Sequence, residues 1–491
     1  MDNTKSAMKK RNNTQTLQYS PPEMKPITAR MLSLFLKSPY TLYCDLFVDP
    51  KYRDPMNEYQ QMLFLAGQNH EIKIMKRQYP NAIEVPTLDR VEGFKALQQA
   101  MKEGVAALHN FPVFFQDLTG NVDILEKRKG ISDLGDRHYV IKEIKVAKNI
   151  KEHHIIQAFF YNYVIGKIQG YTPPEVSLIN RDGEEFAEPY DEKRLLLVLA
   201  GVREVIAGKK VTPTYGKSEW PWESYGNEQA ILEQDVSIVP GVGLGTKEKL
   251  REIGIMTVKD LAFADKDTLL DIKGFGESTV NTMIRGAQAL HRKEAIKIKP
   301  LKLPKRTTEI YLDLEGTGQP IDPEGLAPID YLIGALVKKE DKEEYFPFVA
   351  HTEKEEQTML KAFLTFLQEQ KDIVIYHWHT YERTHLKKLC EKYNIDQKTQ
   401  KMLFDNLIDL YTLATKAYAF PTYGNSIKEI APWMGFHWRQ KDVNAMQSIA
   451  YYLAYLQDPL KNKDKLQKII DYNEDDVRAM VVVRQWLAAH P

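Results

Sequence analysis

The chain has 491 residues, which predicts two to four domains at about 100–200 residues each. Hydrophobic residues make up 43% and charged residues 27%, and these values exclude a collagen-like chain, a wholly disordered chain and a disulfide scaffold. The 67 basic and 67 acidic residues give a formal net charge of zero. This balance argues against a protein that binds polyanions over its whole surface, although a local basic patch remains compatible with it.

The two cysteines, Cys44 and Cys390, lie far apart in the sequence and are too few for a four-cysteine zinc or iron–sulfur site. Their number suits a reducing compartment. The longest apolar runs, residues 195–200 and 479–483, are shorter than the roughly 18–20 residues of a membrane helix. No apolar stretch follows the basic residues 9–11, so we expect a cytoplasmic protein with no secretory signal and no membrane partner.

The first part of the chain, residues 27–235, alternates helical and strand patterns after a polar, proline-containing tail at residues 1–26. Apolar spacing and β-branched residues distinguish the two kinds of element. We expect helices at residues 29–36, 57–76 and 155–168, and strands at 120–125, 138–147 and 195–199.

An ordered set of polar residues lies within this first part. Gly120-Asn-Val-Asp123 precedes a turn, and the strand Val140-Ile-Lys-Glu143-Ile-Lys145 follows about twenty residues later. Glu143 and Lys145 are two positions apart and share a strand face. Asp123 and Glu143 could hold one cation, and Lys145 could stabilise a developing negative charge or orient a water. A surface pair on an edge strand is the alternative reading.

The next helix adds Gln157 and Tyr161, which are i, i+4 neighbours. This order of motifs resembles the RecB-like branch of the PD-(D/E)XK nucleases, whose fold is a mixed sheet flanked by helices. The resemblance implies that Gln157 and Tyr161 belong to the catalytic set and that an upstream helical histidine completes the metal site. His70, next to Glu71, matches that position; a packed or capping histidine is the alternative. Some relatives bind an iron–sulfur cluster through four cysteines, but here only Cys44 lies near such a position, so we expect no cluster.

Residues 236–291 contain a duplicated pattern, in which an apolar turn and a Gly-x-Gly sequence precede a helix. The two copies are Pro240-Gly241-Val-Gly243 and Lys273-Gly274-Phe-Gly276. They resemble tandem helix-hairpin-helix motifs, which bind DNA without reading its sequence. The glycines permit a tight turn and let backbone N–H groups approach a phosphate. Nearby basic residues could add charge, namely Lys247, Lys249, Lys273 and Arg285. The alternative is a purely structural helical spacer.

A basic, proline-containing linker at residues 292–306 leads to an α/β domain at residues 307–491. Its first strand has period two, so Ile310, Leu312 and Leu314 share one face, whereas Asp313 and Glu315 project side by side from the other. Two such carboxylates repel unless a cation lies between them, and oxygen ligands suit Mg²⁺ or Mn²⁺.

Three further residues of this domain fit the same pattern. Glu382 opens a helix after the strand at residues 373–377, and Tyr472 and Asp476 share one face of a late helix. The set resembles the DEDDy group of RNase H-like 3′–5′ exonucleases. That resemblance implies that Asp313, Glu315, Glu382 and Asp476 hold two divalent ions while Tyr472 orients the attacking water. The middle acid of that family is normally Asp, so Asp409 and Asp475 are alternatives to Glu382.

The whole of residues 27–490 resembles bacterial RecB-like nucleases that carry a C-terminal RNase H-like domain. The expected fold is therefore an α/β multidomain chain with a PD-(D/E)XK restriction-endonuclease-like domain, a helix-hairpin-helix module and an RNase H-like domain. A late segment, residues 426–438, belongs to the resemblance without an assigned chemistry, and we expect it to pack the last helices.

The expected function is metal-dependent hydrolysis of nucleic-acid phosphodiester bonds in DNA processing or repair, with DNA favoured over RNA. No G-x-x-x-x-G-K-[ST] motif is present, so we expect no ATP site, and no residue supports a helicase partner. The alternative is a nucleic-acid-binding scaffold in which one or both sites are inactive.

Overall fold

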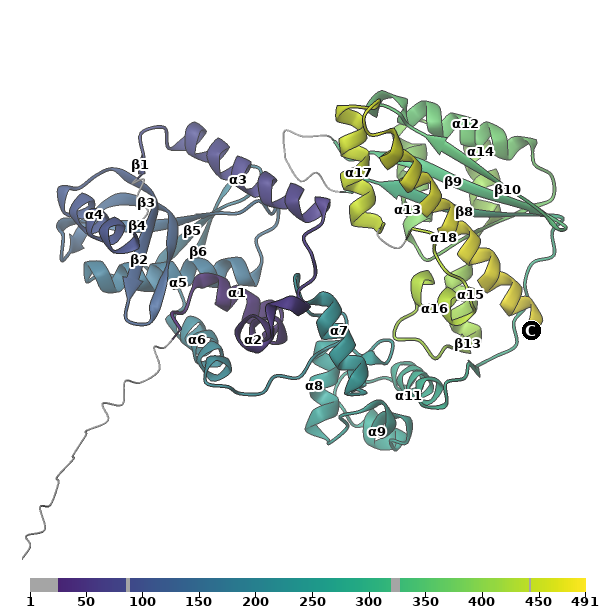
Figure 1. The fold of residues 1–491 in the computed structure, drawn as a ribbon, viewed down its shortest axis with the longest axis horizontal. Helices are drawn as coiled ribbons and strands as arrows, with labels where there is room; N and C mark the ends of the chain where they lie inside the picture. Colours follow the sequence, from purple (N-terminus) through teal and green to yellow (C-terminus); the bar gives the residue numbers. More distant parts are fainter. Residues whose placement is uncertain (1–24, 85–88, 319–326, 441–442) are drawn as a thin grey trace, which may run out of the picture.

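The computed structural model describes residues 25–84, 89–318, 327–440 and 443–491. The tail predicted at residues 1–26 lies outside this range except for its last two residues. Figure 1 shows three parts in chain order: an N-terminal α/β part, a helical module and a C-terminal α/β part. Within the described residues, no helix combines the length and apolar character needed to cross a membrane.

The N-terminal part is built on a six-stranded sheet of order β1-β2-β3-β4-β5-β6. The β1–β2 and β4–β5 pairs are parallel and the other pairs are antiparallel. Its elements are α1 (Ala29–Lys37), α2 (Pro39–Phe47), α3 (Glu58–Gln78), β1 (Ile83–Glu84), α4 (Arg90–Glu103), β2 (Ala107–Phe115), β3 (Leu118–Ser132), β4 (Gly135–Ile144), α5 (Glu152–Gln169), β5 (Glu175–Ile179), β6 (Glu185–Pro189) and α6 (Glu192–Ile206).

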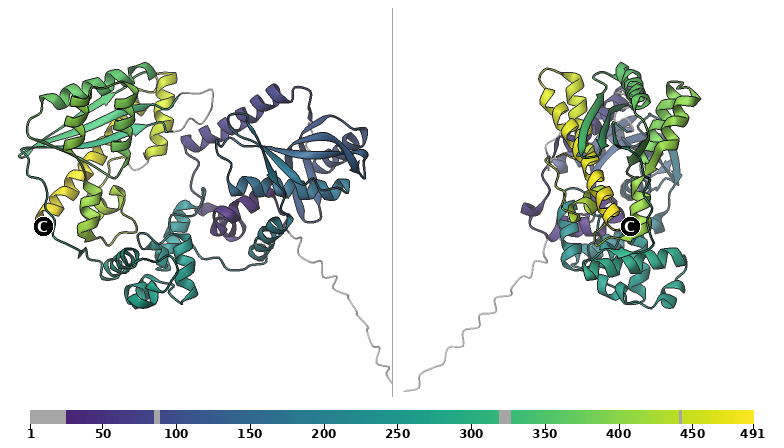
Figure 2. Two further views of the ribbon diagram at one scale, coloured as in Figure 1. Left: turned by 180° about the vertical axis from the view of Figure 1, so that it is seen from behind. Right: turned by 90° about the vertical axis from the view of Figure 1, so that its right-hand side faces the viewer.

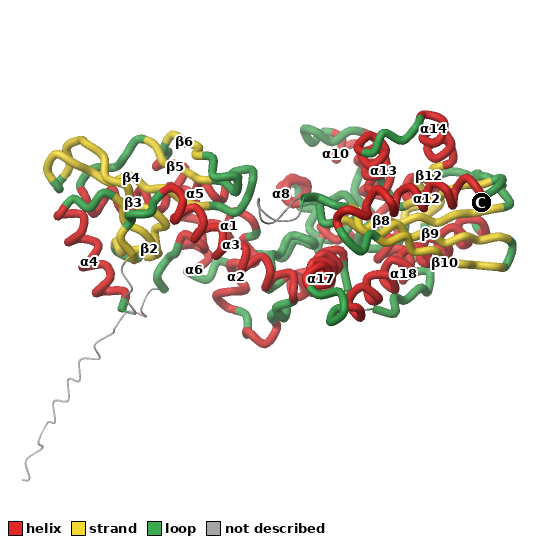
Figure 3. Tube along the Cα trace, turned by 90° about the horizontal axis from the view of Figure 1, so that it is seen from above, coloured by secondary structure: helices red, strands yellow, loops and turns green. Residues whose placement is uncertain are grey.

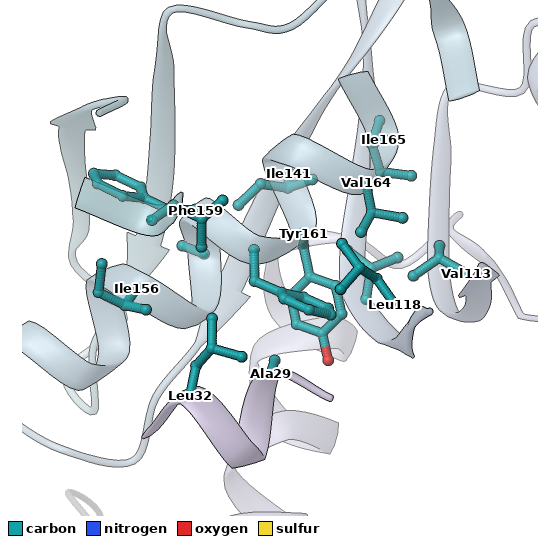
Figure 4. Packing of buried hydrophobic residues seen from close by; sticks show 14 of the residues in the cluster. Ala29, Leu32, Val113, Leu118, Ile141, Ile156, Phe159, Tyr161, Val164 and Ile165 are labelled. Carbon is teal, nitrogen blue, oxygen red and sulfur yellow. The ribbon is translucent and has the colours of Figure 1, made fainter. Parts of the chain in front are cut away.

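Helix α5 forms the centre of the N-terminal core. Figure 4 shows Ile156, Phe159 and Val164 of α5 packed between α1 and the strands that carry Val113 and Ile141. A smaller cluster lies where α3 meets the sheet, and its buried residues are Ile74, Met75, Ile124, Ile144 and Ile179. Successive residues of a strand point to opposite faces, so Ile144 faces α3 while Glu143 points away from it.

The strand predicted at residues 195–199 is wrong, because these residues lie inside helix α6. The buried positions Leu195, Val198, Leu199 and Val202 follow the spacing of one helix face, whereas Leu197 is 75% exposed. The side chain of Asp191 caps the helix by accepting a hydrogen bond from the Arg194 backbone N–H. Because the residues of this run are nearly all apolar, the helical period of about 3.6 residues cannot be read from the sequence.

The helical module has its own core, in which two short helix pairs pack around Val236, Leu250, Leu261 and Val280. Its elements are α7 (Glu223–Leu232), α8 (Leu244–Glu252), α9 (Val258–Ala262), α10 (Lys266–Leu270) and α11 (Glu277–Arg292).

The C-terminal part is built on a five-stranded sheet of order β10-β9-β8-β11-β12. Strands β10, β9 and β8 pair antiparallel, and β8, β11 and β12 pair parallel. Its elements are β7 (Ile296–Lys297), β8 (Thr308–Gly316), β9 (Asp330–Lys339), β10 (Lys342–Val349), α12 (Glu356–Glu369), β11 (Ile373–His377), α13 (Tyr381–Lys392), α14 (Gln397–Asn406), β12 (Leu407–Asp409), α15 (Leu410–Ala417), β13 (Tyr418–Ala419), α16 (Ile427–Trp433), α17 (Ala445–Gln457) and α18 (Lys463–Ala489).

The predicted alternation of β8 is confirmed. Ile310, Leu312 and Leu314 belong to the core that includes α12, whereas Tyr311 belongs to the core on the other side, with α15, α16 and the second half of α18. The sheet therefore has helices on both faces, and α18 crosses it beside β8 (Figure 2).

The first and last parts of the chain also meet directly. Helix α3 lies beside α17, as the view from above in Figure 3 shows, and Lys465 Nζ lies 2.6 Å from Glu58 Oε2. The three parts therefore form an arc that is closed by this contact.

Candidate active site

Three carboxylates from distant segments meet in the C-terminal part. Asp313 and Glu315 come from β8 and Asp476 comes from α18, and one oxygen of each lies within 4.8 Å of the others. Among the residues that the structure describes, no other group of three or more potential metal ligands of the His, Cys, Asp and Glu types is this compact. Glu315 and Asp476 are buried and Asp313 is half-buried.

Each carboxylate is held by a neutral donor. Asn473 Nδ2 donates to Asp313 Oδ2 at 2.6 Å, Ser448 Oγ donates to Glu315 Oε2 at 2.9 Å, and Trp438 Nε1 donates to Asp476 Oδ1 at 2.6 Å. Single hydrogen bonds of this kind orient the carboxylates but leave most of their acceptor capacity open.

A glycine makes room for one of these donors. Gly334 of β9 pairs directly opposite Asp313, and a Cβ atom at Gly334 would collide with Asn473 Oδ1. Tyr345 donates to the same oxygen at 2.8 Å, which fixes the amide so that its nitrogen faces Asp313. Gly334, Asn473, Ser448 and Trp438 were absent from our sequence prediction because each acts through contacts that form only in the fold.

The cluster is strained electrostatically without a cation. Burial and the neighbouring carboxylates raise the pKa of Glu315 to about 8 and that of Asp313 well above its ordinary value. Burial also raises the pKa of Asp476, to about 6, although the Lys428 ammonium opposes this shift. These are the shifts expected of carboxylates that share a site in a low-dielectric environment.

Glu382 lies at the edge of the cluster. It is buried in the first turn of α13, as predicted. Burial and the Asp476 carboxylate raise the pKa of Asp313 and of Glu315 most, and the charge of Glu382 raises both pKa values further. Its Oε2 atom is buried with no hydrogen-bond partner among the described residues, and His377 Nδ1 lies 3.5 Å away.

The alternatives to Glu382 bind elsewhere. Asp409 accepts hydrogen bonds from the His379 backbone N–H at 2.9 Å and from Thr412 Oγ1 at 2.5 Å. Asp475 is bound by Arg439, whose Nε donates to Asp475 Oδ1 at 2.7 Å. Of the three acids, Glu382 is therefore the one with a buried carboxylate oxygen that has no hydrogen bond among the described residues, although Glu382 is not part of the compact three-acid group.

Tyr472 and Lys428 lie against the same cluster. The Lys428 ammonium is 4.1 Å from the centre of the Tyr472 ring and donates to its hydroxyl. Burial and the Asp476 carboxylate raise the pKa of Tyr472, so the phenol keeps its proton. Residues 426–438, which we expected only to pack the last helices, thus supply Lys428 and Trp438 to the site. The polar and aromatic residues of this segment were the available sequence signal.

The residues present fit a divalent cation of the Mg²⁺ or Mn²⁺ type. The donors are carboxylate oxygens, Glu382 Oε2 has no hydrogen-bond partner among the described residues, and the raised pKa values indicate like-charge repulsion that a cation would relieve.

The N-terminal candidates also converge. The Lys145 Nζ atom lies 2.8 Å from Glu143 Oε2, and Asp123 Oδ2 accepts a hydrogen bond from the Ile144 backbone N–H at 2.8 Å. Lys145 follows directly after β4 and is not part of the strand. Burial and Glu143 raise the pKa of Asp123 to about 8. Burial lowers the pKa of Lys145, but the charges of Glu143 and Asp123 outweigh burial and raise this pKa overall. Glu143 is 2% exposed, and its Oε1 has no hydrogen-bond partner among the described residues.

Tyr161 completes this group on α5. The charges of Glu143 and Asp123, after burial, raise the pKa of Tyr161. A Cβ atom at Gly120 would lie 2.8 Å from the Tyr161 hydroxyl, so the glycine permits the close approach of the ring. Gln157 is half-buried one turn earlier on α5.

His70 is buried in α3, but its ring does not form a compact three-ligand group with Asp123 and Glu143. Its neighbour Glu71 acts on the group instead, because Glu71 contributes to the raised pKa values of Asp123 and Lys145. Glu71 Oε1 also lies 3.0 Å from His109 Nε2. His70 as a metal ligand remains a prediction.

The two glycine hairpins of the module have matching geometry. Gly241 and Gly274 have φ values of +90° and +93°, which L-residues with side chains rarely adopt. Gly243 and Gly276 are the N-caps of α8 and α11, and neither cap supplies a side chain to the first helical turn. Gly241, Gly274 and Gly276 are exposed and Gly243 is half-buried, so backbone of both hairpins is accessible, an arrangement that suits a phosphate.

The expectation that Lys247 adds charge to this surface is wrong. Lys247 is 2% exposed, its Nζ lies 2.9 Å from Asp235 Oδ2, and it donates to Thr214 Oγ1 at 3.2 Å. Its buried ammonium therefore connects α8 to the segment that precedes the module. Lys249 also braces the fold, since its Nζ donates to the Lys273 backbone carbonyl at 2.7 Å and so joins the second hairpin to α8.

Comparison with known proteins agrees with two of the three parts. Residues 310–488 match the RNase H superfamily, and residues 233–289 match the SAM-like helix-hairpin-helix tandem. None of the curated proteins matches the chain. Among solved structures, a family B DNA polymerase from the hyperthermophilic archaeon Pyrobaculum calidifontis is similar at 16% sequence identity and a TM-score of 0.29. That match covers 40% of this chain and 28% of the polymerase chain.

The acid cluster lies on the first strand and last helix of the segment that matches the RNase H superfamily, and the hairpins lie within the other matched segment. The chain therefore carries an RNase H superfamily domain at its C-terminal end, preceded by a helix-hairpin-helix tandem.

Proposed function

We propose that this protein is a metal-dependent nuclease that hydrolyses phosphodiester bonds of DNA at the Asp313–Glu315–Asp476 cluster. The observation that carries the proposal is the convergence of three carboxylates within 4.8 Å in an RNase H superfamily domain. The adjacent hairpin module supports nucleic acid as the substrate, and a phosphate backbone is the ligand that glycine hairpins before helix N-termini suit.

Divalent ions held by these carboxylates would stabilise the attacking water and the leaving oxygen of an in-line displacement. The water loses a proton as its oxygen bonds to phosphorus, the bond from phosphorus to the oxygen of the neighbouring nucleotide breaks, and that leaving oxygen takes up a proton. Asn473, Ser448 and Trp438 orient the carboxylates through their hydrogen bonds. Tyr472, kept neutral by burial and Asp476, can donate to or orient the water.

The finer assignment is a 3′–5′ exonuclease of the DEDDy type with Glu382 as the middle acid. Its position at the start of α13 and its buried oxygen without a hydrogen bond among the described residues support this role. Glu382 is not among the residues whose ligand atoms lie within 4.8 Å of one another, so this role requires its side chain to move toward the three carboxylates when a metal ion binds.

A cleavage assay with end-labelled DNA tests the proposal. The wild-type chain should cut in Mg²⁺ or Mn²⁺ and not in EDTA, and a label at the 5′ end should yield a ladder of shortened strands. Asp313→Asn should abolish this ladder, whereas Asp341→Asn, a matched change in the exposed turn between β9 and β10, should leave it intact. Wild-type binding of every DNA tested without cleavage in either metal would overturn the proposal in favour of a binding scaffold.

The second candidate site is a RecB-like PD-(D/E)XK centre formed by Asp123, Glu143 and Lys145, with Tyr161 and Gln157 beside it. The observation that favours it is the position of the Lys145 ammonium, which contacts Glu143 and whose pKa both Glu143 and Asp123 raise. Lys145→Met should then remove a second set of products that Asp313→Asn leaves unchanged. If Lys145→Met changes no product, the N-terminal group is structural.

A further inference from the structure

The first hairpin and the C-terminal domain together enclose a groove of about 590 Å³. One side is the backbone of the hairpin from Val239 to Gly243, and the other side is formed by two loops of the C-terminal domain. Aromatic rings dominate the lining, namely Tyr215, Trp378, His379, Tyr411 and Tyr423. None of the lining residues that the structure describes is an acid, a lysine or an arginine.

The rings form two groups across the groove. Tyr411 contacts both Trp378 and His379, with ring centres 5.7 Å and 4.6 Å apart, and Tyr215 contacts Tyr423 at 5.7 Å. Four of these five residues are half-buried and His379 is exposed, so part of each ring remains accessible. Such rings can stack with a base of any sequence.

Hydrogen bonds hold the walls of the groove, one of them between two parts of the chain. The Tyr215 hydroxyl, which precedes the module, donates to Glu429 Oε1 of α16 at 3.2 Å. Glu429 in turn accepts a hydrogen bond from Ser426 Oγ at 2.8 Å. The opposite loop is fixed because the His379 backbone N–H donates to Asp409 Oδ1 at 2.9 Å. These hydrogen bonds therefore fix the positions of the residues that line the groove.

Both C-terminal walls are close in the chain to residues of the candidate site. The loop that carries Trp378 continues into α13 and places Glu382 four positions later. The loop that carries Ser426 continues into α16, and Lys428, two positions later, contacts Tyr472. A strand lying in the groove is thus bordered by the glycine hairpin at one side and by the segments that supply the site at the other.

We propose that this groove binds a single-stranded segment of DNA by base stacking and guides it from the first hairpin to the Asp313–Glu315–Asp476 cluster. The inference rests on the nuclease activity proposed above and assigns its substrate path. Aromatic rings stack on bases whose faces are free, which a paired duplex does not offer inside a groove. Because the lining has no cationic side chain, the stacking contribution should depend little on salt, unlike binding through phosphate contacts.

The test measures the affinity of the full chain for a fluorescein-labelled single-stranded oligonucleotide and for a blunt duplex, by anisotropy in EDTA. The groove variant is Trp378→Leu combined with Tyr423→Leu. The matched control is Tyr52→Leu, which alters a tyrosine that is 51% exposed in the N-terminal part. The groove variant should lose about tenfold or more in single-strand affinity, while duplex affinity and the slope of affinity against salt stay unchanged. Equal loss for the control, or no loss for the groove variant, overturns the inference.

Photocrosslinking on the unaltered chain keeps the inference testable if the double variant fails to fold. A single strand carrying 5-bromodeoxyuridine should crosslink to the peptides that contain Trp378, Tyr411 or Tyr423. Crosslinks confined to other peptides overturn the inference. Neither experiment requires cleavage, so groove binding without cleavage would refute the proposed nuclease activity alone, and cleavage without groove binding would refute this path alone.

Discussion

At the scale of single residues, the carboxylates of the acid cluster destabilise the metal-free fold. Asp313 is surrounded by Asp476, Glu315 and Glu382, and burial together with these charges raises its pKa. Asp313→Asn should remove part of this repulsion and raise the free energy of unfolding of the metal-free protein at neutral pH, on the order of 1 to 2 kcal/mol. The same variant should lose the stabilisation that Mn²⁺ gives to the wild type.

Thermal melts with EDTA and with Mn²⁺ measure both effects, and Asp341→Asn serves as the exposed control. A variant that melts lower than the wild type in EDTA, or one that Mn²⁺ still stabilises fully, contradicts a metal site at Asp313.

Glu315 gives a pH dependence with a defined sign. Its pKa is about 8 in the fold, where burial and Asp476 raise it, against an ordinary value of 4.5. Between these values the folded chain holds a proton that the unfolded chain has lost, so the contribution of Glu315 to stability falls as pH rises. In EDTA, Glu315→Gln should therefore show a smaller decline in stability between about pH 5 and pH 8 than the wild type. Denaturant titrations at several pH values measure the difference, and identical slopes for the two proteins would argue against the buried, repelled state of Glu315.

Several residues of the site could be predicted from the sequence because their spacing fixes their geometry. Asp313 and Glu315 share a strand face, and Tyr472 and Asp476 share a helix face, whatever the rest of the chain does. Trp438 and Lys428 could not be predicted in the same way, because each reaches the site from a segment whose position depends on the assembled fold. Asn473 lies on α18 with Tyr472 and Asp476, but its hydrogen bond to Asp313 forms only when α18 packs on β8.

At the scale of elements, the difficulty lay in short apolar runs. Residues 195–199 satisfy both a strand and a helix, and the helix became recognisable only from the burial of every third or fourth residue along α6. In β8 the alternation was unambiguous because charged and apolar residues take turns along the strand.

The helix α8 illustrates how burial changes the role of a charge. Burial lowers the pKa of Lys247, and the Asp235 carboxylate beside it opposes this shift. Lys247→Met should cost about 3–5 kcal/mol, because it leaves the buried Asp235 carboxylate without its cation. Its DNA binding should keep the salt slope of the wild type, whereas Lys273→Ala, which changes an exposed hairpin lysine, should reduce that slope by about one unit if it contacts a phosphate.

Urea denaturation and binding at several salt concentrations measure both quantities for the two variants. A Lys247→Met protein of wild-type stability with a reduced salt slope would restore the interpretation of Lys247 as a phosphate contact.

At the scale of the whole molecule, the order of the three parts followed from the sequence, but their packing did not. The contact between α3 and α17, with the ion pair of Glu58 and Lys465, joins residues that are about 400 positions apart. The aromatic groove likewise combines Tyr215 with Trp378 and Tyr423. Such juxtapositions have no local sequence signal, since neither partner alone forms a recognisable motif.

In the proposed reaction, metal ions bound by the carboxylates of Asp313, Glu315 and Asp476 act on a phosphodiester bond. The most direct test measures cleavage of a DNA strand whose scissile phosphate carries sulfur in place of one non-bridging oxygen, in Mg²⁺ and in Mn²⁺. If a bound metal contacts that oxygen, sulfur should slow the Mg²⁺ reaction, and the softer Mn²⁺ should restore it. We expect this rescue for the wild type and no cleavage by Asp313→Asn. Equal slowing in both metals, or cleavage that continues in EDTA, would contradict it.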